Sequence, residues 1–174
     1  MASMFPKKIL IDGYNVIKEP RVGFRSFPSL ELQREHLIKI LKSSPQLQRS
    51  QTTVVFDSRI YIPPSRTQKH GNLTVIFTPL NKSADEVIQQ LVRQSSQPGK
   101  ILVVTSDRSI QLTAKDHGAR AMESHVFWQK LQTRKKNRSV GRGEPQEGTT
   151  PLSDREVKEW LSLFRSRGGE NDER

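Results

Sequence analysis

The chain has 174 residues, which suits one compact domain with a tail, and it carries a formal net charge of +11. A chain this basic attracts polyanions, nucleic acid above all, although part of the excess charge can serve solubility. It has no cysteine, which excludes disulfides, thiolate catalysis and cysteine-ligated zinc or iron–sulfur sites.

The hydropathy pattern shows no segment that would cross a membrane. No apolar run approaches the roughly 18 residues that a membrane-spanning helix needs, and the stretch before the first apolar run is too short for a signal peptide. We therefore expect no membrane partner, and a place in the cytoplasm or, in a eukaryote, in the stroma or matrix of an organelle.

The first third of the chain predicts two strands separated by a helix. Apolar runs predict strands at residues 7–11 and 52–56, and glycines and prolines mark residues 12–28 as a loop. Apolar residues at helical spacing predict a helix over residues 29–43, with Ser29 as its N-cap.

The middle of the chain continues this alternation of strands and helices. A polar loop over residues 58–72 leads to a third strand at residues 73–77, and a capping-box pattern at Ser83 begins a helix that ends before Pro98. The later elements are a strand at residues 101–105, a helix at 109–117, a strand at 119–122 and a helix at 124–133. Such alternation predicts an α/β fold, a three-layer α/β/α sandwich with a central parallel sheet.

The composition changes at Arg134, where basic residues crowd a stretch that also holds glycine and proline. We interpret it as a flexible basic linker. A second capping-box pattern at Ser153 precedes an amphipathic helix, and residues 165–174 are expected to be disordered. The chain thus divides into a domain over residues 1–133 and a linker, helix and tail over residues 134–174.

Four carboxylates lie at the ends of predicted elements. Asp12, Asp57 and Asp107 follow apolar strand runs, and Asp85 lies in the first turn of the helix that begins at Ser83. The carboxyl ends of parallel strands share one edge of a sheet, and carboxylates that meet there repel one another unless a cation lies among them. Hard oxygen ligands suit Mg²⁺ or Mn²⁺, so the pattern favours metal-dependent phosphodiester chemistry. Asp12, Asp85 and Asp107 are the preferred ligands, and Asp57 is a less favoured one.

Each of these residues also has a purely structural interpretation. Asp12 can cap its own turn, and Asp85 can face a helix dipole. Asp57 and Asp107 can orient a loop or cap the next helix. Asn15 can position Asp12 or a metal-bound water in a catalytic role, or it can simply serve the turn. The coincidence of four carboxylates at one edge favours function, because together they would be uncompensated like charges.

Basic residues flank the expected acidic edge and continue into the linker, where they can follow a phosphate backbone. Those expected to bind RNA are Arg59, Arg66, Lys69, Lys82, Arg108, Arg134, Lys135, Lys136 and Arg138. Tyr14, Tyr61 and Phe24 are candidates to stack on bases, although packing is the commoner role of such aromatics.

Motifs of other phosphate chemistries are absent. The sequence has no P-loop pattern, and its histidines show no paired metal spacing. A small-phosphoester hydrolase of the haloacid-dehalogenase type needs a second aspartate two residues after the first, and the chain has Tyr14 there.

Several motifs follow one another in unbroken order over about residues 7–131. They are Ile-Asp-Gly-Tyr-Asn-Val-Ile at 11–17, Val-Val-Phe-Asp at 54–57, Val-Ile-Phe-Thr at 75–78 with Ser-Ala-Asp at 83–85, Val-Thr-Ser-Asp at 104–107 with Gln111, and Gly118-Ala119. This set resembles the YacP-like branch of the NYN domains in the PIN-like nuclease superfamily. The resemblance implies a Mg²⁺- or Mn²⁺-dependent endoribonuclease whose acidic positions match Asp12, Asp85 and Asp107. It also implies an association with translating ribosomes and cleavage of messenger RNA.

The sequence departs from the family pattern in two respects. Lys82 stands where an acidic residue precedes Ser/Thr-Ala-Asp, and the fourth carboxylate is either Asp57 or Glu86. The leading hypothesis is an endoribonuclease. The alternative is a non-catalytic RNA- or ribosome-binding protein with the same fold, which Lys82 and the positive charge favour. The sequence predicts no oligomeric state.

Overall fold

A computed structural model describes residues 5–59 and 66–138 of the chain, with side chains described up to residue 133. A six-stranded sheet in the order β3-β4-β2-β1-β5-β6 lies at its centre. The strands are β1 (Lys8–Asp12), β2 (Gln51–Phe56), β3 (Thr67–His70), β4 (Leu73–Phe77), β5 (Ile101–Val104) and β6 (Arg120–Met122). Neighbouring strands run parallel except for β3, which is antiparallel to β4.

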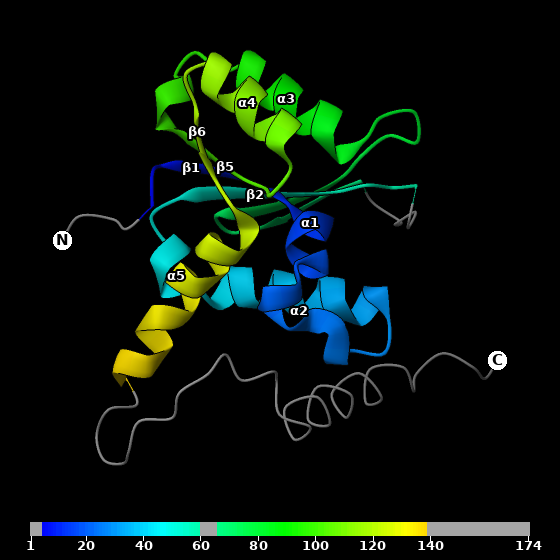
Figure 1. Cartoon of the computed structure of the whole chain (residues 1–174), viewed down its shortest axis with the longest axis vertical. Coiled ribbons are helices and arrows are strands. Elements are labelled where there is room, and N and C mark those ends of the chain that lie inside the picture. The colour runs from blue at the N-terminus through cyan, green and yellow to red at the C-terminus, as the bar shows by residue number, and fades with distance from the viewer. Residues whose placement is uncertain (1–4, 60–65, 139–174) are drawn as a thin grey trace.

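Helices cover both faces of the sheet, so the molecule has three layers (Figure 1). One face carries α1 (Gly13–Lys18), α2 (Leu30–Ser43) and α5 (Ser124–Arg138), and the other carries α3 (Ala84–Arg93) and α4 (Arg108–Asp116). Successive strand residues point to opposite faces. Ile9 and Ile11 of β1 therefore pack in one buried cluster with Trp128, whereas Leu10 packs in the other with Ile88. The predicted three-layer α/β architecture is confirmed.

The connections place a topological switch point beside β1. The chain passes from β1 through β2 to β4 on one side of the sheet, then crosses to β5 and β6 on the other. Open α/β sheets bind ligands at the carboxyl ends of the strands where the strand order reverses. The carboxyl ends of β1 and β5 flank this position, with Asp12 as the last residue of β1 and Asp107 shortly after β5.

Side-chain caps set the expected helix starts. The Leu32 N–H donates to Ser29 Oγ (3.2 Å) at the start of α2. At α3 both bonds of the capping box are present, between Ser83 and Glu86. Local sequence therefore fixes where these two helices begin.

The prediction of a loop over residues 12–28 is wrong. Asp12 is the N-cap of α1, and two short 3₁₀ helices follow at Pro20–Val22 and Phe24–Ser26. Glycine and proline indicated turns, but the apolar residues between them are buried against the sheet, and this packing stabilises a helix too short to stand alone.

The sheet is parallel as predicted except at its β3 edge. Residues 67–70, expected in a loop, form β3, and Gly71 at φ 62° makes the tight turn into β4. The strand Thr-Gln-Lys-His shows no alternation of apolar and polar residues, so its sequence does not indicate a strand. Its hydrogen bonds to β4 hold it in the extended conformation at the edge of the sheet.

The last described helix is longer than expected. The sequence predicts an end at about Thr133, but α5 continues to Arg138, so the basic stretch that begins at Arg134 starts as helix. The rest of the predicted linker, the second helix and the tail lie outside the described residues. Among the helices of the described ranges, none is long and apolar enough to span a bilayer.

Candidate functional site

The four carboxylates singled out in the sequence lie at the carboxyl edge of the sheet. Asp12 ends β1, Asp57 follows β2, Asp85 lies in the first turn of α3 after β4, and Asp107 caps α4 after β5. We call these four residues the acidic edge. Electrostatic coupling connects them, because the charge of Asp107 raises the pKa of both Asp12 and Asp85.

Asp12 is the most buried of the four, with 8% of its surface exposed. Burial is the main cause that raises its pKa to about 6, and the charges of Asp85 and Asp107 act in the same direction, against the Asn15 N–H and Lys18, which lower it. The Asn15 N–H donates to Asp12 Oδ1 (3.2 Å). A carboxylate that is buried away from water and lies near two other carboxylates is stabilised either by binding a proton or by binding a cation.

Asp85 and Asp107 differ from each other in their environments. Burial and the charges of Asp107 and Asp57 raise the pKa of Asp85. The pKa of Asp107 lies below its usual range, because both the hydroxyl (2.6 Å) and the N–H (2.8 Å) of Ser109 donate to its Oδ1. The N-cap interpretation of Asp107 therefore holds, and it leaves Oδ2 outside these bonds.

Asp57 is already paired with a cation. The Arg59 guanidinium donates to both of its carboxylate oxygens, with Nε at 3.0 Å from Oδ1 and 3.1 Å from Oδ2. This pairing lowers the pKa of Asp57. Glu86, the other candidate for a fourth carboxylate, accepts the Ser83 N–H in the capping box (2.6 Å). Neither residue therefore resembles Asp12 in its environment.

Asn15 connects the segments that follow three strands, β1, β5 and β6. Its Oδ1 accepts the Ser106 N–H (2.8 Å) and the Ser124 hydroxyl (2.7 Å), and the Ser124 N–H donates to Ser106 Oγ (3.2 Å). Asn15 therefore contacts Asp12 through its backbone, while its side chain ties the segments after β1, β5 and β6 together. Ser124 is fully buried, and its role was not predicted, since it indicated only a helix start.

The predicted RNA-binding residues fall into two groups. Arg59 and Arg108 lie beside Asp57 and Asp107, and Arg66 Nη1 donates to the Thr78 carbonyl (2.8 Å) just beyond β4. Lys82 precedes the start of α3 and donates to Gln90 Oε1 (3.0 Å). These four surround the acidic edge.

The remaining predicted residues lie elsewhere. Lys69 lies on β3 opposite Thr74, near the beginning of β4 and away from the carboxyl ends of the parallel strands. Arg134, Lys135, Lys136 and Arg138 belong to the last turns of α5, which leave the acidic edge (Figure 1). The acidic edge and its basic surroundings thus use only part of the predicted set.

The aromatic candidates for base stacking are packing residues where they are described. Tyr14 and Phe24 are 5% and 1% exposed, and the Tyr14 ring meets Phe56 edge-on at 5.1 Å. Tyr61 lies outside the described residues. Stacking on RNA bases through Tyr14 or Phe24 would require opening the core.

The donor set of the acidic edge fits a hard divalent cation in its chemistry. Carboxylate oxygens suit Mg²⁺, which commonly keeps several waters and takes only one or two carboxylates. Within residues 5–59 and 66–138, no three acidic or histidine side chains are placed to hold one ion together. The arrangement therefore suits a largely hydrated ion, and the pKa of Asp12 shows where a positive charge would be most favourable.

Comparison with known proteins gives the family. The model of the YacP-like NYN domain matches residues 9–165. The chain belongs to the YacP-like NYN domain family, a group of PIN-like nuclease domains. The match extends past residue 131, where the resemblance in sequence was expected to end, into the predicted linker and C-terminal helix.

A curated relative resembles the chain in sequence, and two solved structures resemble it in fold. The chain is 28% identical over 127 residues to the uncharacterized protein YacP of Bacillus subtilis, covering 72% of this chain and 75% of that protein. Crystal structures of Rae1 (YacP) from Bacillus subtilis share the fold. The structure of a mutant form has a TM-score of 0.59 at 22% identity, covering 92% of this chain and 96% of its own, and the other structure scores 0.56 at 23%, covering 91% and 88%.

Proposed function

We propose that the protein is a metal-dependent endoribonuclease whose acidic edge binds Mg²⁺ or Mn²⁺. The observation that carries this proposal is the coupling of Asp12, Asp85 and Asp107 at the switch point of a nuclease-type fold, with the pKa of Asp12 raised to about 6. Natural selection for stability alone would not favour burying a carboxylate beside two others. A bound cation turns this unfavourable arrangement into a favourable one.

In this proposal each residue of the edge has a separate task. The three carboxylates Asp12, Asp85 and Asp107 would hold a largely hydrated cation, directly or through its bound waters, and this cation would supply an activated water and neutralise charge on the scissile phosphate. Asn15 keeps the strand ends in register and fixes Asp12 through its N–H. Asp57 would bind metal only after release from Arg59, so we assign it the task of positioning that guanidinium.

The basic residues around the edge would hold the RNA. Arg59, Arg66 and Arg108 lie near the carboxylates and offer guanidinium groups, which suit phosphate oxygens. Messenger RNA is the proposed substrate, cleaved in association with the ribosome. Support for this finer assignment is the family resemblance and the charge of +11. Co-sedimentation of the full-length protein with ribosomes would test the association.

The test of the activity uses one charge-removing variant with a matched control. The protein is incubated with unstructured RNA in Mg²⁺, in Mn²⁺ and in chelator, and product formation is followed. Cleavage should need the ion and be lost in Asp12→Asn. Asp116→Asn, which makes the same change at an exposed position at the end of α4, should cleave normally. Equal cleavage by the wild-type protein and Asp12→Asn would refute the assignment.

A non-catalytic RNA- or ribosome-binding protein is the second candidate. The placement of the side chains favours this candidate, since no three acidic side chains among the described residues are close enough together to coordinate one metal ion. This candidate predicts RNA binding without cleavage in any divalent ion, unchanged by Asp85→Asn. The activity test above separates the two candidates, because only the nuclease gives ion-dependent products.

A further inference from the structure

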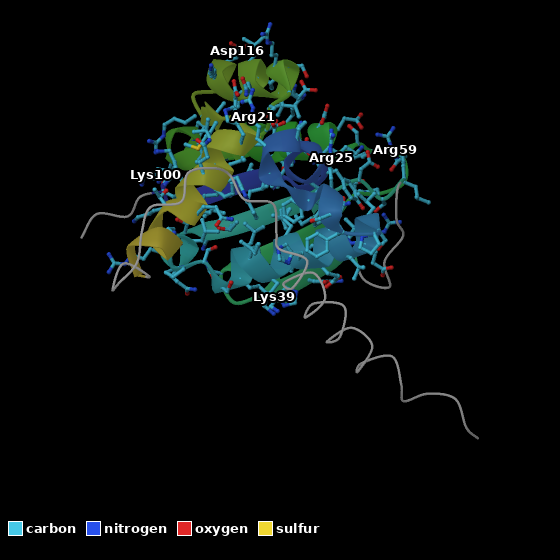
Figure 2. The ribbon with its side chains drawn as sticks, turned by 60° about the horizontal axis from the view of Figure 1, so that its bottom comes forward. Arg21, Arg25, Lys39, Arg59, Lys100 and Asp116 are labelled. Atoms are coloured by element: carbon cyan, nitrogen blue, oxygen red, sulfur yellow. The ribbon has the colours of Figure 1, made fainter. Side chains whose placement is uncertain are left out.

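A second charged site lies at the opposite edge of the sheet, where the parallel strands begin. A cavity of about 380 Å³ opens there, and its lining includes Lys7, Lys8, Arg49, Ser96, Lys100 and Ile101. We call it the basic cavity. Four of its lining residues are cationic and none is acidic. Figure 2 shows Lys100 and Arg59 at opposite ends of the molecule, so this cavity is separate from the acidic edge.

The basic cavity is assembled from segments that are distant in sequence. Lys7 directly precedes β1 and Lys8 begins it, Arg49 precedes β2, and Lys100 directly precedes β5. The parallel register brings them together, since Lys8 pairs with both Gln51 and Ile101. Within the described parts of the chain, Lys7, Lys8 and Lys100 form no ion pair. Solvent and dissolved salt therefore screen the repulsion between these three lysines.

The lining indicates which kind of anion the cavity suits. Lysine is a flexible point charge that binds phosphate without demanding one geometry. The lining has no aromatic side chain, and Ile101 is its one apolar residue. A site for a free nucleotide normally offers apolar surface to the base. The composition here favours a phosphate backbone over a nucleotide recognised by its base.

We propose that the basic cavity binds the phosphate backbone of RNA at a place distinct from the scissile phosphodiester. This inference rests on the proposed function for the identity of the polyanion. β1 places Lys8 and Asp12 at its two ends, about 13 Å apart at roughly 3.3 Å per residue. A single phosphate cannot occupy both sites, so the cavity would hold a further part of the same RNA.

Salt-dependent binding tests this inference. Binding of a labelled 20-nucleotide unstructured RNA is measured by fluorescence anisotropy in chelator, so that no cleavage occurs, over a range of salt concentrations. The variant is Lys7→Gln with Lys100→Gln, two exposed side chains whose loss should leave the fold intact. The slope of log K against log salt should fall by about 1.4, since each contact with single-stranded nucleic acid contributes about 0.7. At 0.1 M salt that change corresponds to about 25-fold weaker binding.

The matched control is Arg21→Gln with Lys39→Gln, which also removes two positive charges and whose residues lie between the two ends of the molecule (Figure 2). It should change the slope much less. Equal slopes and affinities for the two double variants would overturn the inference, because the effect would then come from net charge alone. An unchanged affinity in the Lys7 and Lys100 variant would overturn it too.

The outcome is separable from that of the proposed function. Ion-dependent cleavage that is lost in Asp12→Asn, together with unaltered RNA binding in the lysine variant, would refute the cavity and keep the nuclease. Weaker binding in the lysine variant, with no cleavage in any ion, would refute the nuclease and keep the cavity as an RNA site.

Discussion

The two ends of the parallel strands carry opposite charges, and these charges differ in burial: the acidic end holds a buried carboxylate, whereas the basic end holds exposed lysines. At the acidic edge, Asp12 is buried and hydrogen-bonded, and its pKa is raised to about 6. At the basic cavity, Lys7 and Lys100 are exposed and form no ion pair among the described residues. Buried, fixed charges act strongly on one position, whereas exposed charges act weakly on any polyanion. This difference fits the two proposals, chemistry at the first edge and attachment of RNA at the second.

The largest expected effect is on cleavage and separates the two edges directly. Asp12→Asn should lower the turnover of RNA at saturating Mg²⁺ by at least about 100-fold, because the loss of a ligand removes several kcal/mol of transition-state stabilisation. The Lys7→Gln, Lys100→Gln variant should retain its turnover at saturating RNA. An equal loss of turnover in both variants would contradict the proposal that the acidic edge carries out the chemistry and the basic cavity only binds RNA.

The second effect is the pH dependence of stability at Asp12. Since its pKa is raised from 3.8 to about 6, the folded protein binds this proton more tightly than the unfolded chain does, and stability falls as pH rises between these values. Asp12→Asn should therefore be more stable than wild type by about 3 kcal/mol at pH 8 in chelator, with no gain below about pH 4. Urea unfolding at several pH values measures this difference.

Asp107→Ala is the control of opposite sign. The folded pKa of Asp107 is lowered by Ser109, so its charged form stabilises the fold above the unfolded pKa, and this contribution is lost as pH falls through the folded pKa. Removing this N-cap should destabilise the protein at pH 8 by about 1 kcal/mol. A loss of stability at pH 8 in Asp12→Asn as well would contradict the assignment of a strained, buried charge.

The third effect compares one glycine at each edge. A Cβ on Gly13 would overlap the ring of Phe56, which is fully buried, with Cδ1 only 2.6 Å away. Gly13→Ala should cost about 1–3 kcal/mol of unfolding free energy through overpacking. Gly99, beside the basic cavity, has its nearest such neighbour at 3.8 Å, so Gly99→Ala should stay within about 0.5 kcal/mol of wild type. Thermal unfolding of both variants provides the measurement.

The smallest effect concerns the serines of the two edges. Ser124→Ala removes the hydroxyl that donates to Asn15 Oδ1 and should cost about 1 kcal/mol, because Asn15 keeps its bond from the Ser106 N–H. Ser96→Ala, an exposed position of the basic cavity, should change the unfolding free energy by less than about 0.5 kcal/mol. Chemical denaturation measures both unfolding free energies, provided that their dependence on denaturant concentration is the same in the two variants. Equal losses in the two variants would show that the hydrogen bonds of Asn15 add no stability.

Patterns within a few residues predicted much of the acidic edge. An apolar run that ends in a carboxylate placed Asp12 and Asp107 at strand ends, and the capping box placed Asp85 in the first turn of a helix. These features depend on neighbours in the chain, so the sequence displays them. The state of Asp57 was less predictable, since its pairing with Arg59 depends on the loop conformation.

Features that depend on distant partners were not predicted. Ser124 reaches Asn15 across 109 positions of the chain, and nothing near Ser124 indicates that partner. β3 has no apolar pattern and exists because β4 offers it an edge. The glycine at the start of α1 suggests a turn and so predicts a loop, whereas burial of the apolar side chains that follow stabilises a helix.

The sequence by itself determined the alternation of strands and helices, the net positive charge and the carboxylates at the element ends, because periodicity and capping are local. The tertiary structure alone decided that these carboxylates share one electrostatic field, that Asn15 ties three strand ends together, and that lysines from separate segments line one cavity. The physical reason is that coupling between charges and hydrogen bonds depends on distance in space, which the parallel register of the sheet sets.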